Sequence, residues 1–175
     1  LRMDGSWRTG RPGAPGAPRH EIRVWLATGS MQAVGVRVHD VEVRPTRDEA
    51  RWVGHLGQDI MAEGFDAQSA AAVLASTDRP LVEALLDQRL VCGMGTIWAS
   101  ELASEVGANP HARTALVVGL AEGLTSIRIR MLGAVDAPAA SRRELRVFER
   151  TGRPCRRCGT PIRCTVRGWR RWGAT

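Results

Sequence analysis

The stretch that decides the fold is 85-LLDQRLVCGMGTIWASE-101. It places the short turn Gly93-Met94-Gly95 between two segments whose apolar residues follow helical spacing. Both glycines can adopt positive φ, and the second helix opens with backbone N–H groups that have no acceptor within the helix. Because such an N-terminus binds anions, Gly95 and Thr96 are candidates for presenting amides to a phosphate. The alternative is an ordinary corner between two helices, where short glycine turns are common.

The whole string resembles the helix-two-turns-helix segment of the formamidopyrimidine-DNA glycosylase / endonuclease VIII family. Members of this family are DNA repair glycosylases with an associated lyase activity at abasic sites. The matching residues are Leu85, Leu86, Asp87, Gln88, Gly93, Met94, Gly95, Ile97, Trp98, Ala99 and Glu101, followed by Gly107, Asn109, Pro110 and His111. The family usually has an asparagine after the second glycine, where it touches the backbone of the damaged strand. Thr96 stands there in this chain, and its hydroxyl can bond a phosphate with shorter reach.

The charge of the chain agrees with a nucleic-acid partner. Its 25 basic residues are all arginine, and they face 18 acidic residues, which gives a formal net charge of +7. A basic excess of this kind supplies the salt-dependent part of phosphate binding. Between residues 142 and 171 arginines recur, with Glu144 and Glu149 as the acidic residues. A GC-rich coding sequence also inflates arginine content, but it accounts for the missing lysine better than for this clustering.

Length and composition predict a small globular protein. At 175 residues with 43% hydrophobic content, the chain can hold one ordinary domain or two small ones. No apolar run reaches the length of a membrane span, and no leader-like segment opens the chain. We therefore expect a soluble monomer in the cytoplasm, associated with the nucleoid. Four cysteines in such a chain favour metal ligation or free thiols over disulfides.

Two kinds of periodicity divide the chain. Residues 22–26 and 33–43 alternate in polarity on either side of Thr28-Gly29-Ser30, which predicts an antiparallel hairpin. Helical spacing follows. Asp66 is a candidate N-cap for a helix over 67–75, Asp78 precedes a helix through Leu90, and a later helix is expected over 114–132.

The order of strands, then helices, then a cysteine-bearing tail predicts an α+β fold. The resemblance implies four parts: the C-terminal part of an antiparallel β-sandwich over 1–45, a linker over 46–64, the helix-two-turns-helix domain over 65–140, and an arginine-rich, incomplete zinc-finger hairpin over 141–175. The run 55-HLGQD-59 resembles the start of the family's helical domain, and we interpret it as structural.

The catalytic residues of the family have no counterpart in these 175 residues. Family members attack the damaged nucleoside with the amine of an amino-terminal proline, assisted by a glutamate and a lysine. This chain begins Leu1-Arg2 and contains no lysine, so we expect the catalytic part to be missing and the chain alone to be catalytically incomplete. Residues 1–7, LRMDGSW, resemble the end of the family's sandwich core. The resemblance implies that Met3 is the wedge that fills the void left by a flipped nucleotide.

The tail carries a CxxC pair in 153-RPCRRCGTPI-162, where Gly159 lets the chain fold back so that Cys155 and Cys158 reach one metal. It resembles the first half of the family's zinc finger. Structural zinc takes four ligands, and only Cys164 follows. Either these three cysteines bind zinc with a borrowed ligand, or the hairpin holds zinc weakly or not at all; we expect the second outcome. By the same resemblance, Arg170 falls near the hairpin-tip arginine that binds the DNA backbone at the lesion.

Two functions from different classes are compatible with the sequence. The first is binding of damaged double-stranded DNA in base excision repair, as part of a bifunctional glycosylase and abasic-site lyase. The second is a non-catalytic DNA-binding or protein-interaction module built on the helical corner and the arginine-rich tail. A truncated or decayed reading frame is a third possibility.

Overall fold

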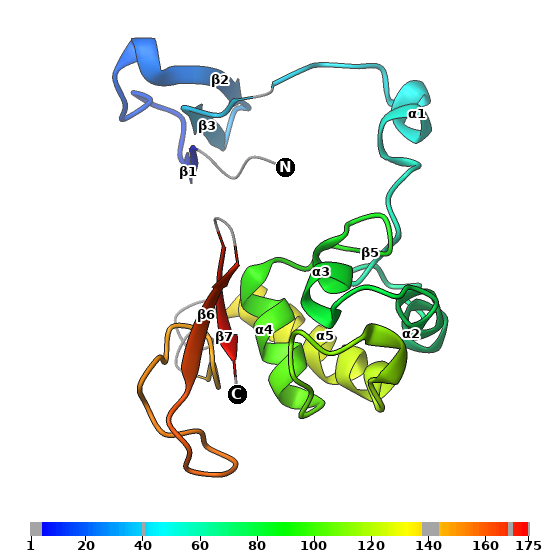
Figure 1. Cartoon of the computed structure of the whole chain (residues 1–175). Helices are drawn as coiled ribbons and strands as arrows, with labels where there is room; N and C mark the ends of the chain where they lie inside the picture. Colours follow the sequence, from blue (N-terminus) through cyan, green and yellow to red (C-terminus); the bar gives the residue numbers. More distant parts are fainter. Residues whose placement is uncertain (1–4, 40, 138–143, 168–169, 175) are drawn as a thin grey trace. The chain divides into compact units, whose positions relative to one another are not determined.

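Figure 1 presents the computed structural model, which describes residues 5–39, 41–137, 144–167 and 170–174, with side chains as far as Cys164. The chain divides into two compact units, Leu1–Ala50 and Arg51–Thr175, which we call the sheet unit and the helical unit. Strands and helices are therefore both present, as the sequence predicted.

The sheet unit is a three-stranded antiparallel sheet. Its strands are β1 (Ser6–Gly10), β2 (Ile22–Ala27) and β3 (Gln32–Val36), in the order β1-β3-β2, and the turn η1 (Arg19–Glu21) precedes β2. The predicted hairpin is confirmed as the β2–β3 pair, with Trp25 opposite Val34.

The second strand of that hairpin ends earlier than expected. It stops at Val36 because Arg37 adopts a φ of 54° and donates its amide hydrogen to the carbonyl of Glu21, which turns the chain out of the sheet. Val41 and Val43, which the alternating pattern assigns to the strand, are exposed. The alternating valines therefore predicted the strand but not its end, because the pattern continues beyond the last residue that pairs in the sheet.

Short elements span the boundary between the two units in the sequence and open the helical unit. The turn η2 (Thr46–Asp48) leads into α1 (Glu49–Val53), and the two-residue strands β4 (Gln58–Asp59) and β5 (Val91–Cys92) pair in parallel. Gly57 fits only as glycine, since a Cβ there would lie 2.2 Å from the carbonyl oxygen of Leu90. This close contact gives Gly57 a structural role within the run 55–59.

Four helices build the core of this unit: α2 (Ala67–Ala75), α3 (Leu81–Leu86), α4 (Thr96–Glu105) and α5 (Leu120–Asp136), with the turn η3 (Thr114–Leu116) before the last. Helices α2 and α4 pack on α5, and α3 packs on α4 (Figure 1). Burying each large aliphatic side chain stabilises the fold by about 1.5–3 kcal/mol. The largest buried apolar side chains are those of Ile60, Leu74, Leu81, Leu85, Met94, Leu102, Leu124 and Ile127.

Helix boundaries confirm one prediction and correct two. Asp66 caps α2, accepting hydrogen bonds from the amides of Gln68 and Ser69 at 3.0 and 3.3 Å. Asp78 starts no helix, because its carboxylate pairs with Arg113 while α3 begins only after Pro80 and ends at Leu86.

The later helix, expected from residue 114, begins only at Leu120. Gly119 adopts a φ of 77° and separates α5 from the turn η3. Within the described part of the chain, no helix combines the length and apolar character needed to cross a lipid bilayer.

The tail ends in an antiparallel hairpin. Its strands are β6 (Arg163–Arg167) and β7 (Arg170–Ala174), with Cys164 opposite Gly173. Before it, residues 152–162 fold back on themselves: Gly152 donates to the carbonyl of Ile162, and the amide of Ile162 donates to the carbonyl of Arg153.

Candidate nucleic-acid interface

The turn between α3 and α4 is held by Gln88. Its Nε2 donates to the carbonyl of Met94 at 2.9 Å, and its Oε1 accepts from the amide of Gly93 at 2.9 Å. The Met94 side chain is buried in the core at 1% exposure. The turn is therefore a fixed corner, since both its backbone and its central side chain are anchored.

The two glycines of the turn have different roles. Gly93 has a φ of 88°, and a Cβ there would lie 2.8 Å from Oδ1 of Asp59, so the position requires glycine. Gly95 has an extended backbone (φ −107°, ψ −172°), and a Cβ there would meet no protein atom within 4 Å. Only Gly93 uses positive φ, whereas Gly95 leaves open space before α4.

Helix α4 begins at this open space. Gly95 is its N-cap and no side chain caps it, while the carbonyl of Gly95 already accepts from Ala99 at 2.9 Å. The amides of the first helical turn, beginning at Thr96, have no acceptor inside an α-helix, and the helix dipole adds positive potential at this end. Gly95 and Thr96, which are neighbours in the chain, thus lie at a helix end suited to an anion.

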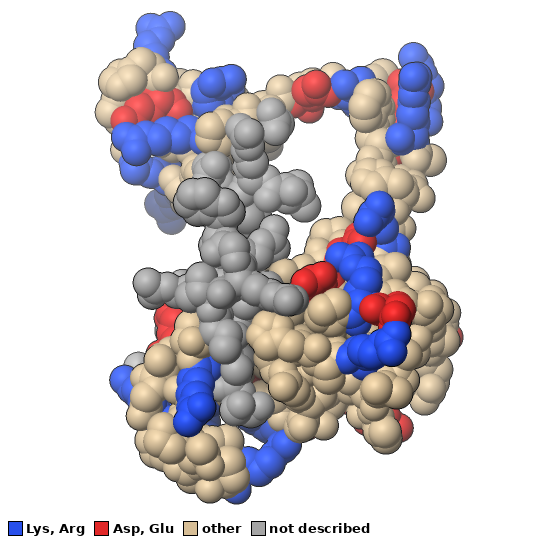
Figure 2. Space-filling model, in the orientation of Figure 1, with Lys and Arg blue, Asp and Glu red and all other residues tan. Residues whose placement is uncertain are grey.

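Charged side chains next to the turn are paired within the protein. Asp87 binds Arg89 at 2.6 Å and Arg79 at 2.7 Å. The hydrogen bonds from Arg89, followed by that from Arg79, outweigh burial and hold the pKa of Asp87 far below its usual range. Figure 2 shows the same mixture over the helical unit, where red carboxylates lie beside blue guanidinium groups. The positive character of the turn therefore comes from backbone amides rather than from these arginines.

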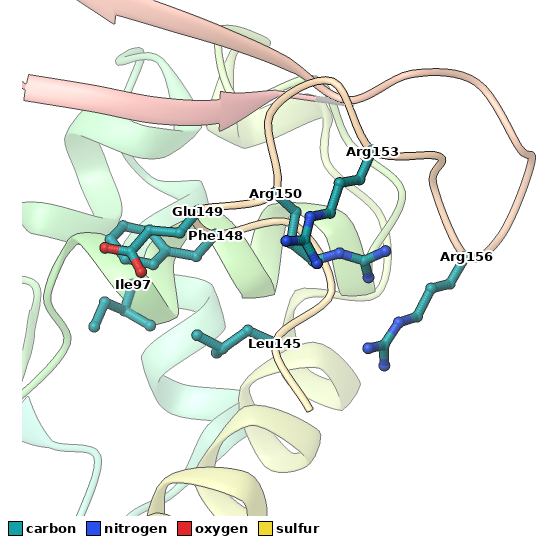
Figure 3. Close-up of a pocket in the computed structure, with 7 residues that line it drawn as sticks. All are labelled: Ile97, Leu145, Phe148, Glu149, Arg150, Arg153 and Arg156. Atoms are coloured by element: carbon teal, nitrogen blue, oxygen red, sulfur yellow. The ribbon is translucent and has the colours of Figure 1, made fainter. Parts of the chain in front are cut away.

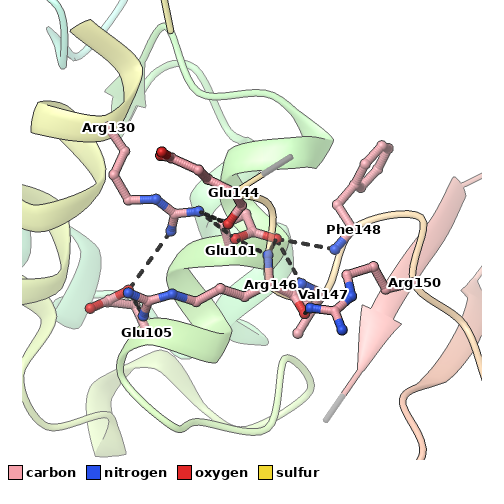
Figure 4. A network of polar contacts seen from close by, with 8 residues as sticks. All are labelled: Glu101, Glu105, Arg130, Glu144, Arg146, Val147, Phe148 and Arg150. Carbon is pink, nitrogen blue, oxygen red and sulfur yellow. Dashed lines mark hydrogen bonds and ion pairs between the residues drawn. The ribbon is translucent and has the colours of Figure 1, made fainter. Parts of the chain in front are cut away.

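Glu101, which the sequence analysis named as a family match without assigning it a role, is the buried charged residue of this region (Figure 4). It is fully buried, and its carboxylate accepts from the amides of Arg146, Val147 and Phe148 at 2.9–3.1 Å. Nη2 of Arg130 donates to the same carboxylate at 2.7 Å. The signal available in the sequence was a glutamate flanked by small and apolar residues in 99-ASELAS-104. The structure shows that all six of these residues are buried.

The pKa of Glu101 reflects two opposed effects. Burial disfavours the charged form, but the Arg130 guanidinium and the three backbone amides favour it more, so the pKa is lowered. Arg130 also lies over the ring of Trp98, 5.5 Å from its centroid. Glu101 is therefore an ionised carboxylate inside the protein, and each of its bonds is charge-assisted.

The C-terminal end of α4 binds the tail as well. Glu105 pairs with Arg146, and its carbonyl accepts from Nη2 of Arg157 at 2.9 Å. Arg157 passes over Gly107, where a Cβ would lie 2.7 Å from its Nη1. A cation at a helix C-terminus is favourable because it meets the negative end of the dipole.

An arginine-lined pocket of about 380 Å³ lies between α4 and the tail (Figure 3). On one side its lining is apolar with one carboxylate, that of Glu149, and on the other side it is basic; the lining residues are Ile97, Leu145, Phe148, Glu149, Arg150, Arg153 and Arg156. Arg150 is tied to the backbone, donating to the carbonyls of Arg146 and Pro154 at 3.1 and 3.2 Å. The arginine side of this lining suits an anionic group, whereas the Glu149 carboxylate on the other side does not.

The cysteine pair forms a tight knuckle. The amide of Cys155 donates to Thr160 at 2.8 Å, Gly159 adopts a φ of 75°, and the amide of Arg157 donates to Sγ of Cys155 at 3.4 Å. Hydrogen bonds to Cys158 from Thr160, then from Cys155, lower the pKa of its thiol. Thiols of this kind in one knuckle are chemically suited to bind a metal.

The rest of a metal site is not assembled by the described residues. Among them no group of three histidine, cysteine or acidic side chains is placed to hold one ion, so Cys164 does not join Cys155 and Cys158 in such a group. A closed structural zinc site requires four ligands. The described residues therefore do not fit a complete zinc site.

Two predicted site residues cannot be placed by their side chains. Arg170 opens β7, and its side chain lies outside the described part of the structure. Met3 lies outside the described residues altogether. Of the predicted site residues, the structure thus places Gly95 and Thr96 at the start of α4, and Cys155 and Cys158 in one knuckle.

Comparison with known proteins identifies the class. No protein-family model matches the chain. It is 39% identical over 178 residues to a probable endonuclease 8 2 of Streptomyces coelicolor, covering 96% of this chain and 64% of that protein. It is 36% identical over 179 residues to the DNA-(apurinic or apyrimidinic site) lyase Nei2 of Mycolicibacterium smegmatis, covering 98% of this chain and 69% of that protein. The chain thus spans about two thirds of the length of these relatives.

The fold agrees with this class. The formamidopyrimidine-DNA glycosylase of Lactococcus lactis, crystallised with DNA containing an abasic site, matches 99% of this chain and 70% of its own with a TM-score of 0.79 at 24% identity. The mixed helix-and-strand architecture is therefore that of these glycosylases. The chain belongs to the formamidopyrimidine-DNA glycosylase / endonuclease 8 family.

Proposed function

We propose that this chain binds damaged double-stranded DNA in base excision repair, as the DNA-binding portion of a bifunctional DNA glycosylase and abasic-site lyase. The observation that carries the proposal is the uncapped N-terminus of α4, fixed behind the glycine turn and open in front of Gly95. A phosphate of the damaged strand would accept hydrogen bonds there from the amides at the start of the helix. Thr96 would add its hydroxyl.

Further contacts come from the ends of the chain. Arg170, in the hairpin β6–β7, would bind the backbone near the lesion, and Met3 would enter the space left by the flipped nucleotide. The formal charge of +7 supplies the salt-dependent part of the affinity. The relative from Mycolicibacterium smegmatis is named as an abasic-site lyase, which supports this class of partner.

We assign the parts of the chain accordingly. Residues 1–45 correspond to the end of the β-sandwich, 46–64 to a linker, 65–140 to the helix-two-turns-helix domain, and 141–175 to the incomplete zinc-finger hairpin. The protein acts as a monomer in the cytoplasm at the nucleoid. Zinc is bound weakly or not at all, because Cys155 and Cys158 form only half of a ligand set and Cys164 is not gathered with them.

Catalysis requires a nucleophilic amine that these residues do not offer from a side chain. Schiff-base formation at an abasic site uses a deprotonated amine, and the 175 residues contain no lysine. The chain by itself is therefore proposed to bind its DNA without cleaving it.

Binding and chemistry are tested separately. Fluorescence anisotropy of a labelled duplex carrying a stable abasic-site analogue, measured at several salt concentrations, should give an affinity that falls steeply with salt and exceeds that for intact duplex only slightly. Borohydride reduction on a true abasic-site duplex should trap no covalent complex. Salt-insensitive binding, or no binding, would contradict the DNA-binding proposal and favour the alternative of a protein-interaction module. Efficient trapping would contradict catalytic incompleteness.

A further inference from the structure

We infer that Glu101 is a positioning residue, which fixes the arginine-bearing segment 146–157 to α4 so that this segment and the N-terminal amides of α4 meet DNA as one rigid surface. This role rests on the proposed function, because it concerns how the DNA-binding groups are held. The Glu101 carboxylate is buried and would not touch DNA itself; it would act by holding the groups that do.

The first support is the density of bonds at one side chain. The Glu101 carboxylate accepts from three consecutive amides, those of residues 146, 147 and 148, at 2.9–3.1 Å, and from the Arg130 guanidinium at 2.7 Å. Three amides that converge on one anion define the path of the backbone that carries them, as Figure 4 shows. A carboxylate without these partners would not remain ionised at zero exposure.

The second support is that no helix or sheet ladder within the described residues fixes this segment, whose other attachment beside the carboxylates is the buried side chain of Val147, next to buried Leu145. Between residues 144 and 162 the structure contains no helix or strand, apart from one isolated bridge between Pro154 and Pro161. Regular backbone pairing therefore does not hold the segment to α4. The Glu101 bonds take its place, together with those of Glu105 to Arg146 and Arg157.

The third support is that both groups share one rigid element. Glu101 lies five residues after Thr96 on the same helix, which corresponds to about 7–8 Å along its axis. The pocket lining combines Ile97 of α4 with Arg150, Arg153 and Arg156 of the segment (Figure 3). Fixing the segment at Glu101 therefore fixes these arginines relative to the helix N-terminus.

The fourth support is that the anchor uses no cysteine. Its acceptors are the Glu101 and Glu105 side chains and a helix carbonyl, and its donors are backbone amides and guanidinium groups. The position of the segment is accordingly set without a metal, in a chain whose described residues do not fit a complete zinc site.

The test compares Glu101→Gln with Glu122→Gln, an exposed position on α5 where the same charge is removed. A glutamine has a single acceptor oxygen and turns N–H groups toward the amides of 146–148. Each protein is titrated into the abasic-analogue duplex between about 50 and about 200 mM salt. Hydrogen exchange of amides 146–148 is measured on the same samples, and thermal unfolding confirms that each variant is folded.

For Glu101→Gln, the amides of 146–148 should exchange at least tenfold faster. The slope of log affinity against log salt should become shallower by about 0.9 for each phosphate that an arginine of the segment no longer neutralises. Glu122→Gln should keep the parent's exchange and slope. Glu101→Asp, which retains the charge but shortens the side chain, should give an intermediate slope, and it replaces the glutamine variant should that protein not fold.

If Glu101 only supported folding, its substitution would lower the amount of active protein. The protein that remained folded would keep the parent's slope of log affinity against log salt. An unchanged slope despite fast exchange at 146–148 would therefore overturn the positioning role while leaving the proposed function intact. Unchanged exchange would overturn it as well. Absence of salt-dependent binding by the parent chain would overturn the proposed function, and the positioning role with it.

Discussion

The side chain of Gln88 bridges the glycine turn by accepting the amide hydrogen of Gly93 at 2.9 Å, while its own Nε2 donates to the next carbonyl, that of Met94. The single side chain of Gln88 thus bonds one backbone N–H group and one backbone carbonyl of the turn. Its backbone carbonyl also accepts from Gly57 at 2.9 Å. Gln88 therefore ties the corner to the beginning of the helical unit.

Serine substitutions at the two glycines should have opposite effects on stability. Gly95→Ser should leave the protein as stable or stabilise it by roughly a few tenths of a kcal/mol, because serine is a somewhat better N-cap than glycine and the space is open. The same hydroxyl would occupy the amides of α4 and weaken DNA binding by about 1–2 kcal/mol. Thermal unfolding and anisotropy measure the two effects, and Thr96→Ala should weaken binding less.

Gly93→Ser is the matched control for this prediction. It should destabilise the fold by about 1–3 kcal/mol, since a side chain at φ 88° is strained and its Cβ would meet Asp59 at 2.8 Å. Equal losses of stability at both positions would contradict the distinction between them. Unchanged DNA affinity in Gly95→Ser would remove the helix N-terminus from the interface.

Acid should remove the stability that Glu101 contributes. Its pKa is lowered in the folded protein, so its contribution is complete above the unfolded value of about 4.3 and is lost as the pH falls through the folded pKa. Near pH 7, Glu101→Gln should be less stable than the parent by about 3–5 kcal/mol, as expected when one partner of a buried ion pair is removed. Urea unfolding at a series of pH values should show this difference shrinking below pH of about 4. A difference independent of pH would contradict the ionised state of Glu101.

The thiols should differ in reactivity, and zinc content should be low. Iodoacetamide should modify Cys158 before Cys92 near neutral pH, because hydrogen bonds from Thr160 lower the pKa of the first while burial, then Asp59, raises that of the second. Mass spectrometry of the labelled peptides measures the order. Elemental analysis of the purified chain should find well under one zinc per molecule. Stoichiometric zinc that survives mild chelation would contradict the incomplete site.

Charge reversal at Arg170 should weaken DNA binding more than charge reversal elsewhere. Arg170→Glu removes a proposed phosphate contact, whereas Arg23→Glu changes the same charge at an exposed position of β2. Both variants alter the long-range field equally, so the excess loss in Arg170→Glu, about 1–2 kcal/mol, reports direct contact. Anisotropy at low and moderate salt provides the comparison. Equal losses would exclude Arg170 from the site.

The sequence predicted correctly those features that depend on residues close together in the chain, such as a helix N-cap and a glycine turn. Asp66 is recognisable as an N-cap because its side chain bonds amides two and three residues away, and Gly93 because a tight turn needs its conformation. The end of β3 at Val36 depends instead on Glu21, which accepts the amide of Arg37 from another part of the sheet unit. Asp78 similarly pairs with Arg113, 35 residues away, rather than capping a helix.

The roles of Glu101 and Gln88 could not be predicted from neighbouring residues, because these roles also depend on contacts formed by the fold. Glu101 is defined by amides 45 to 47 residues further along the chain, and its own neighbours in sequence do not reveal them. The Gln88 side chain bonds residues five and six positions further on, yet these bonds form only when the turn has formed. Family resemblance could mark both positions without indicating what they bind.

The backbone conformation of Glu149 shows that the length of the tail segment is constrained at this point. Glu149 adopts a φ of 57°, a conformation that costs a residue other than glycine about 1 kcal/mol or more. The backbone reverses at this residue, between Phe148, whose amide binds Glu101, and Arg150, whose guanidinium binds the carbonyls of Arg146 and Pro154. The bonds of Phe148 and Arg150 lie on either side of Glu149 and involve different partners. Inserting or deleting one residue there would therefore move one of these groups away from its partner. The segment therefore tolerates changes of side chain far better than changes of length.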